Sequence, residues 1–134
     1  MADRELFDAA MRARTTAYAP YSRFYVGAAL RDEHGRIHVG CNVENAAYPQ
    51  GLCAEAGALA AMVAAGGRQC VTIAISGTGT LVTPCGGCRQ KLREFGDDRM
   101  PIHVCDETGM LLRTFLLEEL LPFSFGPESL EGTM

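Results

Sequence analysis

The run CVTIAISG, residues 70–77, constrains the fold more than any other part of this sequence. Nearly all of its residues are apolar or β-branched, as in a central strand that is buried on both faces. An alanine-rich helical segment, residues 52–67, comes before it, and a second helical segment, residues 85–96, follows it. Two glycines at positions 66 and 67 end the first of these helices. The pattern predicts a buried strand between two helices of an α/β fold.

The remaining segments alternate between helical and extended patterns. Apolar spacing predicts a helix from Arg4 to Ala17, which ends before Pro20. The predicted strands are RFYVGAALRD (23–32), RIHVGCNVE (36–44), CVTIAISG (70–77), MPIHVCDE (100–107) and MLLRTF (110–115), and LLEELLP (116–122) is a last helical turn. The first two strands form a hairpin around EHGR. Strands that alternate with helices after a hairpin predict a three-layer α/β/α domain with a mixed five-stranded sheet, spanning residues 1–134 as one domain.

Length and charge narrow the class of function. A chain of 134 residues is long enough for one domain with a hydrophobic core. Its net charge is −4 and its basic residues are scattered, whereas a nucleic-acid-binding protein shows a basic stripe. The uncharged alanine-rich run, residues 56–67, is too short to span a bilayer, and the charged N-terminus is unlike a signal peptide. We therefore expect a cytoplasmic protein that binds a small molecule, without nucleic acid or membrane as partner.

The six cysteines divide into two groups. Without a secretion signal we expect them to be reduced rather than paired in disulfides. Cys41, Cys70 and Cys105 stand singly in apolar segments, where free cysteine packs as a small buried hydrophobe. The others, Cys53, Cys85 and Cys88, lie at the predicted starts of the two helices. These three are the candidates for chemistry.

The pair Cys85 and Cys88 in TPCGGCRQ has three interpretations: a redox dithiol, half of a structural zinc knot, or two ligands of a catalytic metal. Residues three apart share a helix face, and a helix N-terminus favours thiolate over thiol. A thioredoxin-like redox dithiol usually lies in the first βα unit, whereas this pair follows two helices and three strands. No aromatic residue directly precedes the pair either. Both observations disfavour the redox interpretation. A four-cysteine knot needs a second C-x-x-C, which the sequence lacks.

The third interpretation needs another ligand, and Cys53 in GLCAEA supplies it. Side chains in the first turn of a helix project past its N-terminus, so two parallel helices on one sheet can aim three thiolates at one point. Three protein ligands leave the fourth position of zinc open, which is typical of a catalytic site. Glu55 lies in the same first turn, where acidic residues are also favoured by the helix dipole alone. Together, C-x-E and P-C-x-x-C match the signature of zinc deaminases, whose first ligand is His or Cys.

From end to end, the chain resembles the small cytidine deaminases of the three-cysteine, homotetrameric kind. The motifs that carry the resemblance, in the family's order and approximate spacing, are YSRFYVGAAL, NVENAAY, CAE, TPCGGCRQ and ELLPFSF. The resemblance implies a Zn²⁺ enzyme of pyrimidine salvage that deaminates cytidine and 2'-deoxycytidine hydrolytically to the uridine nucleosides and ammonia. It implies that Cys53, Cys85 and Cys88 bind zinc and that Glu55 moves protons.

The resemblance also implies a set of nucleoside contacts. Asn42 and Glu44 would hold the ribose hydroxyls, and residues i and i+2 of a strand do face the same way. Phe24 would pack against the nucleoside, and the backbone at Ala54 would contact the pyrimidine edge. Each of these residues also has an ordinary structural explanation, in packing or in turn capping.

Three further residues are implied at the edge of the site. Phe125 would stack on the base bound by a neighbouring subunit of a homotetramer with shared active sites, and Tyr48 would lie near that shared pocket. Arg89 would hydrogen-bond the zinc-bound thiolates. The chain departs from the family in two places: Ala56 stands where many relatives have arginine, and the usual LLPGAF reads LLPFSF, in which Phe123 adds bulk.

Three other functions are alternatives to cytidine deamination. A deaminase that edits polynucleotides is disfavoured by the acidic net charge, the lack of a basic groove and the small size. A non-catalytic zinc module is disfavoured by Glu55 and by the open coordination position. A deaminase of another aminopyrimidine, such as blasticidin S or a modified cytosine nucleoside, stays open.

Overall fold

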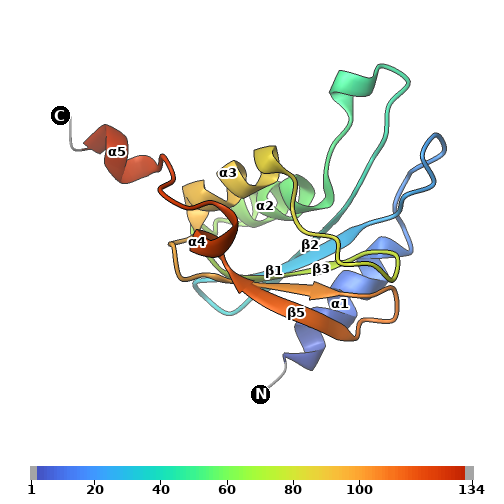
Figure 1. Ribbon diagram of the computed structural model, residues 1–134, viewed down its shortest axis with the longest axis horizontal. Helices are drawn as coiled ribbons and strands as arrows, with labels where there is room; N and C mark the ends of the chain where they lie inside the picture. The colour runs from blue at the N-terminus through green and yellow to red at the C-terminus, as the bar shows by residue number, and fades with distance from the viewer. Residues whose placement is uncertain (1–2, 132–134) are drawn as a thin grey trace.

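A mixed five-stranded sheet forms the middle layer of the computed structural model, which describes residues 3–131 (Figure 1). The strand order is β2-β1-β3-β4-β5. β3 and β4 are parallel to each other, and every other neighbouring pair is antiparallel. The strands are β1 (Gly27–Asp32), β2 (Ile37–Cys41), β3 (Cys70–Ser76), β4 (Pro101–Cys105) and β5 (Leu111–Leu116). The predicted fold class is confirmed.

Helices cover both faces of this sheet. The helix α1 packs on one face, while α2 and α3 lie side by side on the other (Figure 1). The helical elements are α1 (Arg4–Arg14), η1 (Tyr48–Gln50), α2 (Ala54–Ala64), α3 (Gly86–Phe95), α4 (Leu117–Leu120) and α5 (Pro127–Glu131). None of the helices within residues 3–131 is both long enough and apolar enough to cross a membrane.

The central strand β3 is buried as its sequence predicts. Ile73 and Ile75 belong to the core under α2 and α3, whereas Ala74 points to the smaller core under α1. All three side chains are inaccessible to solvent. Burial on both faces explains why this strand has no polar alternation.

Several element boundaries differ from the sequence prediction. The second strand ends at Cys41, not at Glu44, so Asn42 and Glu44 lie beyond the strand that was expected to hold them. The first strand begins at Gly27, not at Arg23, because residues 21–26 form a loop that is held by side chains rather than by a neighbouring strand. The first helix ends at Arg14 instead of Ala17. The short helix α5 was not predicted at all.

Two glycines let β2 and α2 pack backbone against backbone. A Cβ atom on Gly40 would lie 2.4 Å from both Ala54 O and Ala58 N, which is closer than real contacts allow. Opposite it, a Cβ on Gly57 would lie 3.4 Å from the Gly40 Cα atom, an ordinary contact. The approach fixes the first turns of α2 against the sheet, and these turns carry Cys53 and Glu55.

The close contact predicts different effects on stability for alanine at Gly40 and at Gly57. Gly40→Ala should lower the free energy of unfolding by about 1–3 kcal/mol, because the added methyl group forces α2 away from β2. The matched control Gly57→Ala, in the same contact, should be neutral or stabilising by up to about 1 kcal/mol through its helix propensity. Urea unfolding followed by far-UV circular dichroism measures both. A Gly40→Ala protein as stable as the parent would contradict the close approach.

Candidate metal centre and active site

Three cysteine thiols converge where α2 and α3 begin. Cys53 is the N-cap residue of α2, Cys85 is the N-cap residue of α3, and Cys88 lies in the first turn of α3. Their sulfur atoms all lie within 4.8 Å of one another. The convergence expected from sequence is therefore present. Strands β2, β3 and β4 run in the same direction, so α2 and α3, which connect them, both begin at the same end of the sheet.

The local structure leaves these thiols available as ligands. Neither N-cap cysteine uses its side chain to cap its helix, although N-cap side chains often accept such a bond. The Sγ atoms of Cys53 and Cys85 are 3.9 Å apart, far more than the bond of about 2.05 Å in a disulfide. The free N–H groups and dipoles of two helices point toward the same cluster, which favours negative charge there.

The sulfur cluster has the size of a zinc site. Tetrahedral Zn²⁺ with Zn–S bonds of about 2.3 Å separates its sulfur ligands by about 3.8 Å, close to the observed spacing. Burial raises the pKa of Cys53 and of Cys88, while a backbone hydrogen bond from Cys88 lowers that of Cys85. A coordinated divalent cation overrides this burial effect, because a metal-bound thiol is deprotonated. The donor set therefore fits zinc with one open position.

Glu55 is the acidic side chain beside the cluster. It is the second residue of α2 and only 5% exposed. Burial raises its pKa, and hydrogen bonds from its own backbone N–H and from the Cys88 thiol oppose that rise. A raised pKa lets a carboxyl group hold a proton more readily than an ordinary glutamate, which favours a role in general acid–base catalysis.

A pocket of about 180 Å³ opens in front of the thiols and Glu55. Its lining combines predicted site residues with three that the sequence did not single out. The lining residues are Phe24, Val26, Asn42, Cys53, Ala54, Glu55, Val82, Thr83 and Cys85. Of these three residues, Thr83 could have been identified from the sequence, because it directly precedes Pro84 and Cys85. Val26 and Val82 look like core residues in the sequence.

Asn42 secures one wall of this pocket. Its Oδ1 atom accepts a hydrogen bond from Val26 N at 2.9 Å, and its Nδ2 atom donates one to Phe24 O at 2.7 Å. One of the two Nδ2 hydrogens is used in this bond, so the amide keeps a second donor for a ligand. Asn42 thus shapes the loop that carries Phe24 as well as lining the pocket.

Glu44 and Tyr48 line a neighbouring pocket of about 380 Å³ rather than the one that holds the thiols. The Glu44 carboxylate accepts bonds from Tyr21 N at 3.0 Å, Ser22 N at 3.1 Å and Ser22 Oγ. These bonds lower the pKa of Glu44, with the Ser22 hydroxyl as the main cause. The rings of Tyr21 and Tyr48 meet edge to face, 6.4 Å apart. Tyr21 and Ser22 are further lining residues that sequence reasoning missed.

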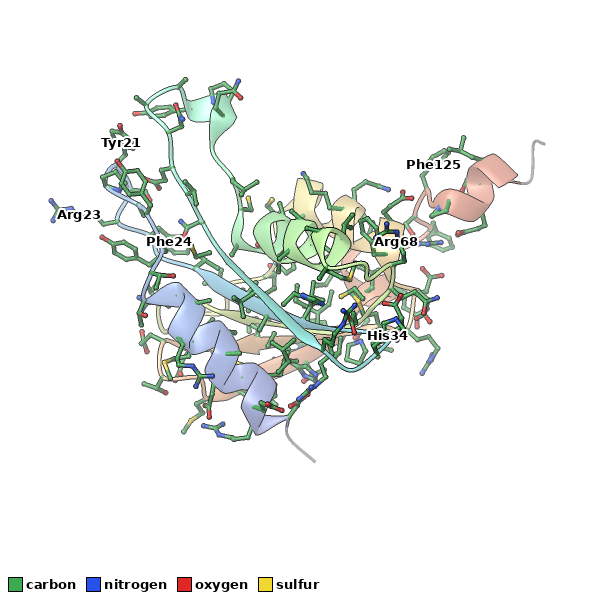
Figure 2. All side chains as sticks on the ribbon, turned by 180° about the vertical axis from the view of Figure 1, so that it is seen from behind. Tyr21, Arg23, Phe24, His34, Arg68 and Phe125 are labelled. Atoms are coloured by element: carbon green, nitrogen blue, oxygen red, sulfur yellow. The ribbon has the colours of Figure 1, made fainter. Side chains whose placement is uncertain are left out.

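Phe125 lies apart from both pockets of its own chain. It is 59% exposed and lines neither of them. Figure 2 shows Phe125 next to α5, at the opposite end of the molecule from Tyr21 and Phe24. Within one chain, therefore, Phe125 is not part of the cluster that contains Glu55.

Arg89 holds the loop in front of Cys85. Its guanidinium donates to Pro84 O and Leu120 O, each at 2.7 Å, and to Thr83 Oγ1 at 3.1 Å. Among the described residues, no bond from Arg89 to a cysteine sulfur accompanies these three. The bonds to zinc-bound thiolates that the resemblance implies stay a prediction.

Comparison with known proteins agrees with this arrangement. Residues 1–104 match the family model described as the cytidine and deoxycytidylate deaminase zinc-binding region. The cytidine deaminase of Sporosarcina psychrophila is 42% identical over 120 residues, 89% of this chain and 88% of its own. That of Mycobacterium tuberculosis H37Rv is 42% identical over 122 residues, 90% of this chain and 87% of its own. The crystal structure of the Burkholderia pseudomallei cytidine deaminase, 41% identical, superposes with a TM-score of 0.85 and covers 93% of this chain and 100% of its own.

Proposed function

The chain belongs to the cytidine and deoxycytidylate deaminase family, and from this premise we propose that it hydrolyses cytidine and 2'-deoxycytidine to uridine and 2'-deoxyuridine with release of ammonia. The observation that carries the proposal is the cluster of three thiols within 4.8 Å of one another beside the buried Glu55. That cluster combines a metal-ligand set with an acid–base group in one pocket.

Cys53, Cys85 and Cys88 would hold the Zn²⁺ ion of this enzyme. When bound, zinc supplies a Lewis acid that lowers the pKa of a coordinated water from about 15.7 to near 7. The thiolates come from two helix N-termini, so the helix dipoles stabilise their negative charge. Among residues 3–131, three cysteines form this ligand group, which would leave the fourth position for water and substrate.

Glu55 would carry the protons of the reaction. Its carboxylate accepts a proton from the attacking water and passes it to ring N3 of the cytosine, which makes C4 more electrophilic. A new C4–O bond then forms. Glu55 takes the second proton from the new C4 hydroxyl and delivers it to N4 as the C4–N4 bond breaks, so that the C4 carbonyl forms and ammonia leaves. The raised pKa supports this role, because the side chain must hold a proton between the two transfers.

The two neighbouring pockets would share one nucleoside. The pocket at the thiols, about 180 Å³, is below the range of about 300–1,000 Å³ for drug-sized ligands, so it suits the base alone. Phe24 and Ala54 line this part, and the backbone of Ala54 would contact the pyrimidine edge. Asn42 also lines the pocket at the thiols. Glu44 lines the neighbouring pocket, where the ribose hydroxyls would lie.

The names of the curated relatives favour cytidine over another aminopyrimidine as substrate. A screen of cytidine, 2'-deoxycytidine, cytosine and blasticidin S, followed by ammonia release, distinguishes these substrates. We propose that the enzyme acts in pyrimidine salvage in the cytoplasm. Residues 1–134 would form one domain, with no nucleic acid or membrane as partner.

We further propose a homotetramer whose active sites are shared between subunits. Phe125 would then stack on the base in a neighbour's site, and Tyr48 would lie near the same junction. The exposure of Phe125 and its distance from the pockets of its own chain support this arrangement (Figure 2).

Glu55→Gln tests the proton transfers. The amide cannot carry the proton, so turnover of cytidine should fall by at least about 10²–10⁴-fold while zinc content stays unchanged. Steady-state kinetics and elemental analysis of the same sample measure the two quantities. Cys53→Ala serves as the contrast, because it should lose zinc as well as activity. Near-normal turnover by zinc-loaded Glu55→Gln would contradict the proposed role of this carboxylate.

Hybrid tetramers test the shared site. Phe125→Ala should raise the KM for cytidine, since stacking on a base contributes about 1–3 kcal/mol. When Glu55→Gln and Phe125→Ala subunits are refolded together, some sites combine an intact Glu55 from one chain with an intact Phe125 from another. Activity of the mixture should exceed the sum of the two separate variants. Activity equal to that sum would show that each site is self-contained.

A further inference from the structure

The outward face of α3 binds the segment that contains Phe125. Gln90 donates from Nε2 to Phe125 O at 2.9 Å. Arg89, the residue before it, donates to Leu120 O at 2.7 Å, and Arg93, about one turn after it, donates to Ser124 Oγ at 2.9 Å. The helix that begins with the metal-ligating cysteines is therefore also the support of the C-terminal segment.

Arg93 is the centre of this support. It is only 8% exposed, an unusual position for an arginine. Besides Ser124, its guanidinium bonds to Glu128 in α5 and forms an ion pair with Asp98 at 3.3 Å. A buried guanidinium needs such partners, and its planar fork fixes their directions.

Gly126 completes the contact. A Cβ atom at this position would lie 2.5 Å from the Arg93 Cζ atom, so the backbone of the segment rests directly on the guanidinium. The residues around it are turned outward instead. Phe123 is fully exposed at a left-handed φ of 52°, and Phe125 is 59% exposed. Polar contacts thus hold the backbone of the segment while its two aromatic rings point away from the chain.

We propose that Arg93, through Ser124 and Glu128, is a positioning residue that determines where Phe125 is presented to a neighbouring active site. This inference rests on the proposed function, because it needs Phe125 to contact a neighbour's nucleoside. A merely structural Arg93 would affect stability alone. A positioning Arg93 affects how tightly substrate binds and how freely residue 125 moves, without changing the chemistry at Glu55.

Glu128→Gln is the direct test, because Glu128 is largely exposed and its amide keeps the shape of the side chain. The KM for cytidine should rise about three- to tenfold, which corresponds to about 0.7–1.4 kcal/mol. The kcat and the zinc content should not change. Arg93→Lys keeps the charge but loses the fork, and it should shift KM in the same direction. The matched control is Glu118→Gln, which removes another arginine–glutamate pair, Arg99–Glu118, on the adjacent α4; its KM should equal that of the parent.

A fluorescence measurement separates this inference from the proposed function. The chain has no tryptophan, so Phe125→Trp introduces a single reporter at the presented position. Its anisotropy should fall when Glu128→Gln is added and should not change with Glu118→Gln. If Phe125→Ala raises KM but Glu128→Gln changes neither KM nor anisotropy, the role of Arg93 is wrong. If Phe125→Ala itself leaves KM unchanged, the proposed stacking fails, and with it this inference.

Discussion

The close packing of α2 on β2 is the constraint on which the rest of the structure depends. Gly40 lets the helix backbone approach the strand, and the parallel pair β3 and β4 places α3 beside α2 with its N-terminus at the same edge. Cys53 and Cys85 then face each other as the two N-cap residues. A shift of either helix by one turn, about 5.4 Å, would separate the thiols by more than a tetrahedral ion can span.

The charge balance of the site follows from this placement. Three thiolates and one Zn²⁺ would have a net charge of −1, which opposes the ionisation of a bound water. Arg89 donates its described hydrogen bonds to Pro84 O, Thr83 Oγ1 and Leu120 O rather than to a cysteine sulfur. The dipoles of α2 and α3, whose N-termini meet at the cluster, would then offset part of this negative charge. The same Arg89 bonds tie the loop before Cys85 to the C-terminal segment.

Much of this fold could be predicted from local patterns, and much of the site from motif spacing. The apolar run of β3 indicated a strand buried on both faces, and the cysteines at the helix starts predicted the thiol cluster. The loop before Gly27 could not be predicted, because most of its residues are β-formers, whereas its conformation is set by hydrogen bonds that Asn42 donates and Glu44 accepts. The helix α5 was missed for a similar reason: its position depends on Arg93, a residue distant in sequence. The nucleoside roles of Phe24 and Phe125 came from family resemblance alone and stay predictions.

Zinc K-edge X-ray absorption on the purified enzyme tests the central claim most directly, namely that three thiolates bind zinc and leave one position open. The account predicts three sulfur ligands at about 2.3 Å and one oxygen or nitrogen ligand at about 2.0 Å. It also predicts that the lighter ligand persists in Glu55→Gln, because Glu55 is not a ligand. A shell of four sulfur atoms would contradict the account, since it would make the site structural and closed.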